Sequence, residues 1–439
     1  MGWMTSRTPS ERTPGTGSGR FTRPGWLAPP IVAAGLLALF AGSAQFGFTA
    51  IAADVANEFG EPMPDAPDDP MAQIGLTLTT LGVGFAIVRL ASLGSLPASS
   101  LADRFGRRRT LLATTAVGLL ATALAAGSPA FWVLVALLAI SRPLLTATDV
   151  VAMVIAAEET RSRDRSAAIA FIGGAYAVGS GIISVARGLL DVALPDPGFR
   201  EVLALVLIPL VLVPFVARRV SEPPRFQRAA ESQRLHQRLG RMPAGYRGRL
   251  AILCAITAGV GLVIGPAWTY LFVYGEGMLG ASPIGMSGLV LAAGPVGLVG
   301  LVVGRFVADR LGRRAAAAST MALAAVMAVV AYSDGFLAFA VGYLTSIVAM
   351  SAYTPAGGAL DTEVFPTSVR STAGGWLAAS GVVGSVLGLF GFGVLVDVTG
   401  SFAPAALLVC GPAAVLALLY GLLPETRGRE LEETAPEPS

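Results

Sequence analysis

Long apolar stretches that carry almost no charge recur along the whole chain of 439 residues, and they restrict its fold more than any other feature. Each has about 20 residues, the length that an α-helix needs to cross the hydrocarbon core of a bilayer. None alternates with period two, as the strands of a membrane barrel do. The sequence therefore predicts an all-α integral membrane protein. Its twelve transmembrane helices are expected at about 29–53, 72–97, 110–128, 130–157, 166–190, 200–217, 250–274, 284–308, 314–332, 335–360, 369–394 and 402–423.

The composition supports this class and removes several others. Charged residues make up 13% of the chain, about half of the roughly 25% found in soluble domains. The two cysteines, Cys254 and Cys410, lie in separate apolar stretches, and His236 is the only histidine. A disulfide framework, a zinc site and a histidine-dependent triad therefore lack their residues. We expect no enzymatic activity, no cofactor, no metal and no nucleic-acid partner.

Arginine is concentrated in alternate loops, which sets the expected orientation in the membrane. Arginine-rich loops face the cytoplasm by the positive-inside rule, and here they follow the second, fourth and eighth helices and join the sixth to the seventh. We therefore expect a multi-pass protein of the plasma membrane with both termini in the cytoplasm. Its expected parts are a disordered tail (1–26), a first six-helix half (27–217), a basic linker (218–249), a second half (250–423) and a second tail (424–439).

Three charged motifs occur twice, in the same order and at nearly the same spacing. Each copy lies at the expected cytoplasmic end of a helix, and the second copies follow the first by 206, 205 and 203 residues. This pattern predicts two six-helix pseudo-repeats (6+6) with the same orientation, around a central cavity. The matching pairs are Asp103–Arg109 with Asp309–Arg314 (DRFGRRR and DRLGRR), Glu158 and Arg165 with Glu363 and Arg370, and Glu222 with Glu425.

The repeated loop motif resembles the Gly-x-x-x-Asp-Arg-x-Gly-Arg-Arg motif of the major facilitator superfamily, although Ser99 and Arg305 replace its leading glycine. The segments SEPPRF, EVFPTSVRSTAGG and PETRGRELEE resemble the metabolite- and sugar-porter branch. The resemblance covers the chain from the first helix to the twelfth. It implies a monomeric secondary active transporter in the lipid bilayer, which works by alternating access. A small-molecule substrate would bind between the halves, with protons as the coupling ion.

The repeated motifs place carboxylates and arginines where the helices have to separate when a carrier opens inward. A network of solvent-exposed pairs suits a cytoplasmic gate, because each pair contributes only about 0–1 kcal/mol. The alternative is that these arginines only fix the topology and contact anionic lipids. The candidate gate residues are Asp103, Arg104, Gly106, Arg107, Arg108, Asp309, Arg310, Gly312, Arg313, Arg314, Glu158, Arg165, Glu363, Arg370, Glu222, Arg225, Glu425 and Arg427.

A few charged residues fall inside the predicted spans. Each costs roughly 2.5–3.5 kcal/mol at mid-membrane and therefore normally faces a cavity or a partner. Arg89 and Asp149 are expected at similar depth on neighbouring helices, with Arg142 nearer the midplane. They form either a static pair or a site where Asp149 takes a proton and an arginine meets the substrate. Arg187 is expected to extend outward to the membrane surface, and Asp54 is the second candidate for the proton.

Polar and aromatic side chains complete the candidate substrate site. Trp268, Tyr270 and Tyr274 follow a Gly-Pro break in the seventh helix, and they suit either an outer gate or an interfacial aromatic belt. Gln45 is the only glutamine well inside a span, and Asn57 is the only asparagine. Because a sugar site needs amides, this amide-poor and arginine-bearing cavity indicates a small organic anion.

Three functions remain open. The first is proton-coupled uptake of a small metabolite. The second is a proton antiporter that exports drugs or metabolites, although the export motif Gly-x-x-x-Gly-Pro-x-x-Gly-Gly is missing from the fifth helix. The third is a membrane sensor without transport, for which neither tail is long enough to form an output domain. Uptake of an organic anion is the function that these residues favour.

Overall fold

The computed structural model of the chain describes residues 27–61, 70–71, 73–160, 164–195, 197–222, 242–366, 368–429 and 431–436, and in these residues there are helices and turns but no strand. Eleven helical segments of this part are long and apolar enough to cross a membrane. The more polar α5 (Arg107–Ala125) is the twelfth. The predicted all-α membrane fold with twelve spans is confirmed.

The first half contains six spans and one short helix. Its elements are α1 (Pro29–Ala50), α2 (Ala52–Phe59), α3 (Leu78–Ala91), the turn η2 (Ser92–Gly94), α4 (Ser95–Phe105), α5, α6 (Phe131–Glu159), α7 (Arg165–Ala193), α8 (Phe199–Ala204) and α9 (Leu207–Ala217). The second span begins at Leu78, six residues later than predicted, because the Thr77 side chain caps the helix and accepts from the backbone N–H of Thr80 at 3.2 Å.

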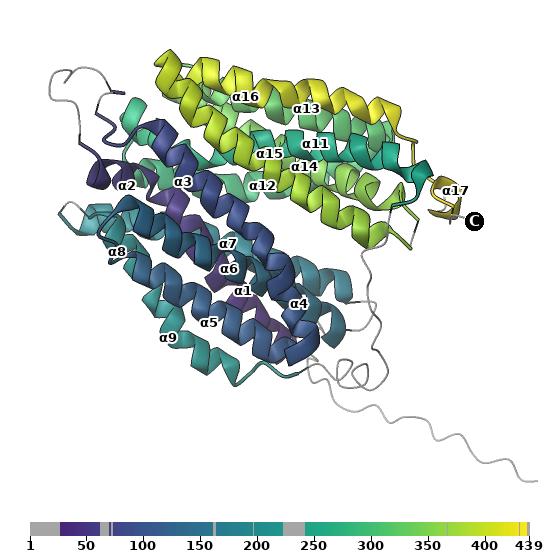
Figure 1. The fold of residues 1–439 in the computed structure, drawn as a ribbon, viewed down its shortest axis with the longest axis horizontal. Helices are drawn as coiled ribbons and strands as arrows, with labels where there is room; N and C mark the ends of the chain where they lie inside the picture. Colours follow the sequence, from purple (N-terminus) through teal and green to yellow (C-terminus); the bar gives the residue numbers. More distant parts are fainter. Residues whose placement is uncertain are drawn as a thin grey trace, which may run out of the picture.

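The second half repeats this order. Its elements are α11 (Ala244–Thr269), the π-helical turn η3 (Val273–Met278), α12 (Pro283–Leu311), α13 (Arg313–Ala331), α14 (Phe336–Glu363), α15 (Arg370–Thr399), α16 (Phe402–Leu416) and η4 (Ala417–Leu422), followed by the short α17 (Leu431–Thr434). In Figure 1 the first half, purple to teal, lies beside the second, green to yellow. The halves meet where α3 packs along α15 and where α7 packs along α12.

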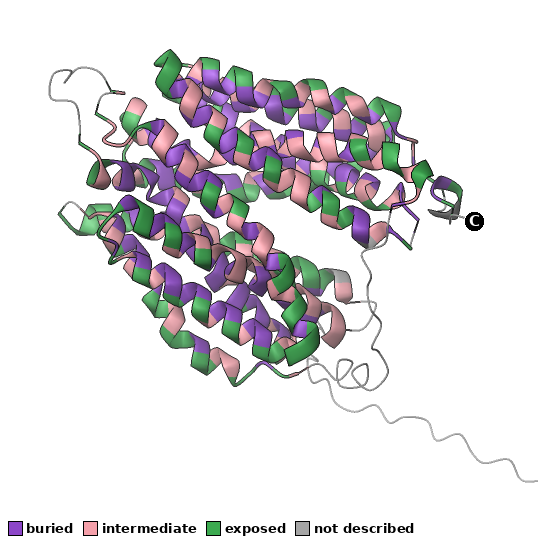
Figure 2. Cartoon of the chain, in the orientation of Figure 1, coloured by how far each residue is buried: buried purple, intermediate pink, exposed green. Residues whose placement is uncertain are grey.

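Apolar side chains cover the outside of the bundle. Exposed positions, green in Figure 2, follow the outer faces of the helices, and many of them are large hydrophobic residues. Leu337 and Val398 are each 77% exposed. A soluble protein rarely exposes apolar surface on this scale, whereas a membrane protein presents it to the lipid.

The polar character of α5 is directed inward. Thr122 and Ser141 of α6 share a hydrogen bond of 2.7 Å, and Thr114 and Thr148 share one of 3.0 Å. The threonine hydroxyls also donate to the carbonyls of their own helix. These hydroxyls are therefore satisfied inside the bundle, and α5 can be less apolar than its neighbours.

Glycines bring the central helices of each half into backbone contact. A Cβ on Gly179 of α7 would lie 2.0 Å from the carbonyl oxygen of Leu39 in α1. A Cβ on Gly384 of α15, 205 residues later, would lie 2.0 Å from the carbonyl oxygen of Ala258 in α11. Both pairs of helices are therefore fixed at the same kind of crossing.

The two ends of the bundle carry different elements. The arginine-rich end carries the turns between α4 and α5 and between α12 and α13. The opposite end carries α2, the start of α3 and η3.

Candidate functional site

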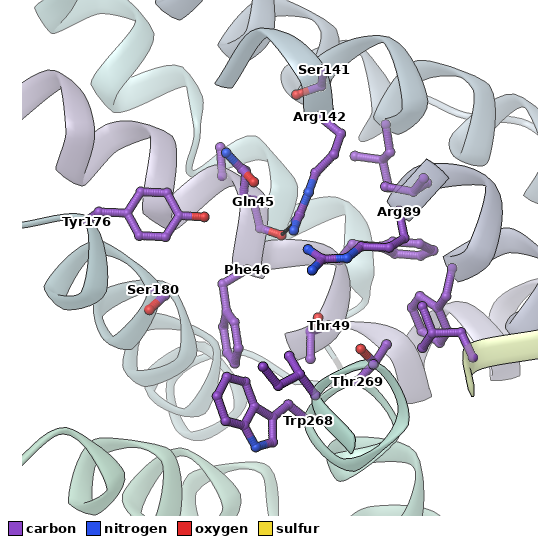
Figure 3. Close-up of a pocket in the computed structure, with 18 residues that line it drawn as sticks. Gln45, Phe46, Thr49, Arg89, Ser141, Arg142, Tyr176, Ser180, Trp268 and Thr269 are labelled. Atoms are coloured by element: carbon purple, nitrogen blue, oxygen red, sulfur yellow. Dashed lines mark hydrogen bonds between the residues drawn. The ribbon is translucent and has the colours of Figure 1, made fainter. Parts of the chain in front are cut away.

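A cavity of about 330 Å³ lies where both halves meet (Figure 3). Helices α1, α3, α6 and α7 of the first half line it, together with α11 and a single residue of α15, Leu389. Its polar lining consists of Gln45, Thr49, Arg89, Ser141, Arg142, Tyr176, Ser180, Trp268 and Thr269. All of these except Trp268 and Thr269 belong to the first half. The polar chemistry of the cavity is therefore concentrated on one side.

Arg89 and Arg142 both line the cavity, as expected for charged residues inside a span. Figure 3 shows their guanidinium groups pointing into the same space, beside Gln45. The Nη1 of Arg142 donates to the backbone oxygen of Gln45 at 3.5 Å, and its Nε is buried without a hydrogen-bond partner. No carboxylate lines the cavity, and neither arginine has an ion pair in the described residues. Two cations therefore face this space without a counter-charge.

Asp149 lies outside this cavity lining. The static pair between Asp149 and an arginine, one of the two arrangements expected from the sequence, is not formed in the part of the chain that the structure describes. The guanidinium of Arg142 extends toward α1 instead. The Asp149 Oδ1 atom is buried and has no hydrogen-bond partner among the described residues. Tyr176 of α7 lines the cavity, and it lies close enough to Asp149 and to both arginines for their charges to act on its hydroxyl.

The remaining candidates divide between the cavity and the packed core. Gln45 and Trp268 line the cavity, and in the described part of the chain the Nε2 of Gln45 and the Nε1 of Trp268 are buried without hydrogen-bond partners. Tyr270 and Tyr274 do not line it. The Tyr270 hydroxyl donates to the Leu389 oxygen at 2.9 Å, and the Tyr274 hydroxyl donates to the Ser333 oxygen at 3.1 Å.

At the opposite end, polar contacts join the two halves. The backbone N–H groups of Leu78 and Thr79, at the start of α3, donate to the two carboxylate oxygens of Asp397 in α15 at 3.0 and 2.7 Å. Tyr270, directly after α11, also packs edge-on against Phe85 of α3, with ring centroids 5.6 Å apart. These contacts close the opposite end.

The expectation that Arg187 extends to the membrane surface is wrong. The residue is 3% exposed and forms ion pairs with Asp54 of α2 and with Glu276 of η3. Asp54, the second candidate for the proton, therefore belongs to this cluster rather than to the cavity.

At the arginine-rich end, two glutamates cap two helices in the same way. Glu222 accepts from the backbone N–H groups of Arg107 and Arg108 at 2.5 and 3.0 Å, at the start of α5. Glu425 accepts from the backbone N–H groups of Arg313 and Arg314 at 3.0 and 3.2 Å, at the start of α13. Each carboxylate thus compensates the positive end of a helix dipole.

The glycine before each capped helix makes room for the carboxylate. Gly106 and Gly312 have φ angles of 97° and 89°, which side-chain-bearing residues rarely adopt. A Cβ at Gly106 would lie 2.9 Å from the nearer Glu222 oxygen, and a Cβ at Gly312 would lie 2.8 Å from the nearer Glu425 oxygen. Gly106 and Gly312 therefore form tight turns between consecutive helices.

The ion pairs of these motifs hold each half together. Arg107 pairs with Asp103 at 3.0 Å and with Glu158 of α6 at 3.2 Å. In the second half Arg313 pairs with Glu363 of α14. Within the described residues, none of the ion pairs at this end crosses between the halves. A gate that depends on such pairs breaking is therefore not visible in this conformation.

The other gate candidates either donate to backbone oxygens or form no ion pair within the described residues. Arg370 donates to the oxygens of Thr362 and Phe365 rather than to Glu363. Arg108, Arg314 and Arg427 donate to the backbone oxygens of Ala217, Gly421 and Arg310, respectively. In the described residues the Nε of Arg165 is buried without a hydrogen-bond partner, and Arg104 and Asp309 have no ion pair. Arg225 lies outside the described residues.

Three residues of these networks were not expected from the sequence. Tyr176 is one of several tyrosines in apolar segments, and nothing in the pattern distinguishes it. Asp397 and Glu276 look like loop or helix-end acids in the sequence, because their partners lie 319 and 89 residues away, in the other half. The only sequence signal for such residues is an acidic residue at the end of a span with no arginine close to it in the sequence.

Comparisons with known proteins agree with this architecture. The family model described as Major Facilitator Superfamily matches residues 33–307 and 296–438. A probable 4-methylmuconolactone transporter of Cupriavidus pinatubonensis is 28% identical over 381 residues, which are 82% of this chain and 85% of that protein. A probable inorganic phosphate transporter of Arabidopsis thaliana is 40% identical over 75 residues, 17% of this chain and 14% of that protein.

Solved structures show the same fold. A D-xylose-proton symporter superposes with a TM-score of 0.73 at 17% identity and covers 91% of this chain and 99% of its own. The xylose transporter of E. coli in an inward open conformation gives a TM-score of 0.69 at 17% identity over 92% of this chain and 98% of its own. A bacterial homologue of the human lysosomal transporter Spinster, in an inward-facing and occupied conformation, gives a TM-score of 0.65 at 15% identity and covers 89% of this chain and 95% of its own.

Proposed function

The chain belongs to the major facilitator superfamily, and from that membership we propose that it carries a small organic anion together with a proton across the plasma membrane, in the direction of uptake. Its family and its relatives show that the chain is a multi-pass membrane transporter of small metabolites and not an enzyme. The substrate class, the coupling ion, the membrane and the direction are the proposal.

The observation that carries the substrate class is the unpaired charge of the cavity. Arg89 and Arg142 face about 330 Å³ of space in which no carboxylate is present. Removing two like charges from water without a counter-ion is costly, and an anionic ligand relieves that cost. The planar guanidinium binds a carboxylate through two parallel hydrogen bonds. Gln45, Tyr176 and Trp268 add donors, and their rings and amide suit an organic rather than a purely ionic substrate.

The coupling proton is assigned to Asp149. Its buried Oδ1 has no hydrogen-bond partner in the described residues, and Tyr176 interacts with it as well as with both arginines. A carboxyl group that is buried without a partner favours its neutral form, and the negative charge of an anionic substrate bound nearby would favour that form further. Binding of substrate and proton would then reinforce each other, which is the requirement for symport.

The orientation follows from the arginine-rich loops. With the arginine-rich end in the cytoplasm, both termini are cytoplasmic, and the contacts of Asp397 and Tyr270 close the external end. An inward-facing carrier would have this arrangement. The inner-gate role of Asp103 and Asp309 belongs to this proposal as well, and it requires that these residues contact the other half in the outward-facing state.

Counterflow in proteoliposomes tests the substrate class. We expect exchange of monocarboxylates or aromatic acids and none of sugars or cationic dyes. Arg142→Ala should abolish exchange, whereas the control Arg200→Ala, which removes an exposed arginine paired with Glu58 outside the cavity, should retain it. Exchange of sugars or cations by the unmodified protein, or full anion exchange by Arg142→Ala, would contradict the assignment.

A further inference from the structure

One guanidinium holds two carboxylates at the opposite end of the bundle. Arg187 donates from Nε and Nη2 to the two oxygens of Asp54 at 2.9 and 2.7 Å. It donates from Nη1 and Nη2 to the two oxygens of Glu276 at 2.5 and 2.7 Å. Only 4% of the Arg187 side chain is exposed, against 20% for Asp54 and 12% for Glu276. Four charge-assisted hydrogen bonds therefore form in a nearly dry site.

The charges of this cluster do not balance. Two ionised carboxylates and one guanidinium leave one negative charge in excess, and Asp191 of α7 adds to the negative field at Glu276. The ring of Phe272, 5.4 Å from the guanidinium carbon, and the Met286 and Phe339 side chains beside η3 are uncharged. A buried charge without compensation is unfavourable, and a carboxylate in this position binds a proton more tightly.

The excess charge depends on how the two halves are arranged. Asp54 and Arg187 belong to the first half, on α2 and α7, and they balance each other. Glu276 belongs to the second half, on η3. When the halves separate at this end, Glu276 moves into water and the Asp54–Arg187 pair stays behind. The unbalanced cluster therefore exists only in the closed arrangement.

We propose that Asp54, Arg187 and Glu276 form a proton-binding site that takes up one proton when this end of the transporter closes and releases it when this end opens. The proton neutralises the excess carboxylate, with Glu276 as its carrier. This site goes beyond the proposed function, because it requires only that the two halves move and holds for any substrate.

The electrostatics of Glu276 support this direction. Burial raises the pKa of Glu276 most, Arg187 lowers it through hydrogen bonding and charge, and Asp54 and Asp191 raise it, so that the pKa lies above its ordinary value. In the open arrangement the carboxyl is in water, where a glutamate has a pKa of about 4.3. Because the closed state binds the proton more tightly, lowering the pH favours the closed state, by up to about tenfold per pH unit between the two pKa values.

The same end contains a matched control. Glu58 lies one turn after Asp54 on α2 and pairs with Arg200 of α8 at 3.0 Å. Both residues belong to the first half, the charges balance, and the side chains are 48% and 41% exposed. Opening does not change this pair, so Glu58→Gln should leave the pH response unaltered.

The test is a pH titration of the distance between the halves. The full-length protein, with Cys254 and Cys410 replaced by alanine, carries spin labels at Ala130→Cys and Thr399→Cys, which are exposed positions of the two halves. Distances are measured by pulsed electron spin resonance in lipid nanodiscs without substrate, from about pH 8 to about pH 5, around and above the ordinary glutamate pKa.

We expect the short-distance population to grow as the pH falls. Glu276→Gln should remove this response and keep the end closed throughout, because the amide oxygen still accepts from Arg187. Asp54→Asn should also remove the pH response and keep the end closed, because it leaves one carboxylate and one guanidinium in the cluster. This variant replaces Glu276→Gln in the test if Glu276→Gln does not fold. A short-distance population that shrinks on acidification, or an unchanged response in either variant, would overturn the proposal. Neither result depends on which substrate the protein carries.

Discussion

Replacing Glu425 by glutamine removes the negative charge that caps α13. Its Oε1 accepts from the backbone N–H groups of Arg313, Thr426 and Arg427 at 3.0, 3.1 and 3.0 Å, and its Oε2 accepts from that of Arg314 at 3.2 Å. In Glu425→Gln one oxygen can keep its three donors, but the amide NH₂ would face the Arg314 N–H as a second donor. The cap is therefore lost in part and the charge entirely.

The expected loss of stability is modest and can be ranked. An N-cap contributes about 0.5–2 kcal/mol and an acid at a helix N-terminus about 0.3–1 kcal/mol, so Glu425→Gln should cost about 1–2 kcal/mol at this half-exposed site. Glu222→Gln should cost less, because within the described residues Glu222 accepts from two backbone N–H groups instead of four. Gly312→Ala should cost more, because it adds about 1–3 kcal/mol of backbone strain and displaces the carboxylate.

The pH dependence separates a charge effect from a general loss of packing. Burial raises the pKa of Glu425, but the backbone N–H groups of Arg427, Arg313, Arg314 and Thr426 lower it more, so the pKa lies below its ordinary value of 4.5. A lowered pKa means that the carboxylate stabilises the fold above pH 4.5 and loses this effect as the pH falls through the folded-state pKa. The difference between the unmodified protein and Glu425→Gln should therefore be constant near neutral pH and shrink below about pH 4.

The assay is thermal unfolding of the detergent-solubilised protein, followed by intrinsic fluorescence at neutral and acidic pH. Glu425→Gln should unfold at a lower temperature than Glu222→Gln at neutral pH. Equal unfolding temperatures of Glu425→Gln and the unmodified protein at neutral pH would refute the reasoning, and so would a difference that persists unchanged at about pH 3, well below the ordinary glutamate pKa.

Further predictions concern coupling, closure and topology. Asp149→Asn should abolish accumulation driven by a pH gradient but spare counterflow, and accumulation that remains pH-driven would place the proton elsewhere. Asp397→Ala should leave the Thr77 cap in place but remove the carboxylate of the other half that accepts from Leu78 and Thr79. Losing such a contact at a helix start should weaken external closure by about 1 kcal/mol. Thr49→Cys should then react roughly fivefold faster with an impermeant maleimide added outside, and an unchanged rate would contradict this closure. Reporter fusions after Glu58 should lie outside the cell and those after Glu222 inside, and the reverse would refute the orientation.

The twelve spans and the two repeats could be predicted because the constraints on them are local. A span needs a certain number of apolar residues, and the repeated motifs occur at a constant offset. The sequence identifies Glu222 and Glu425 as gate candidates, but it does not predict that they cap helices. Their motifs suggested side-chain ion pairs, whereas the carboxylates bind backbone N–H groups that a composition pattern does not reveal.

The candidate site was predicted only in part for a geometric reason. The rise per residue gives the depth of a side chain along its helix, and this sufficed to place Arg89 and Arg142 at the cavity. It does not give the direction in which a long side chain extends, which depends on its neighbours. Asp149 therefore has no arginine partner in the described residues, and Arg187 is buried against Glu276, which comes from the other half.

The uneven lining of the cavity has a consequence for how such a protein can evolve. Both arginines and nearly all other polar groups come from the first half, while the second contributes Trp268, Thr269 and apolar surface. Under the proposed function, the first half recognises the substrate and the second half covers it. Cargo preference can then drift through substitutions in one copy without disturbing the moving surfaces of the other. A hybrid that joins this first half to the second half of a relative should inherit its preference from the first.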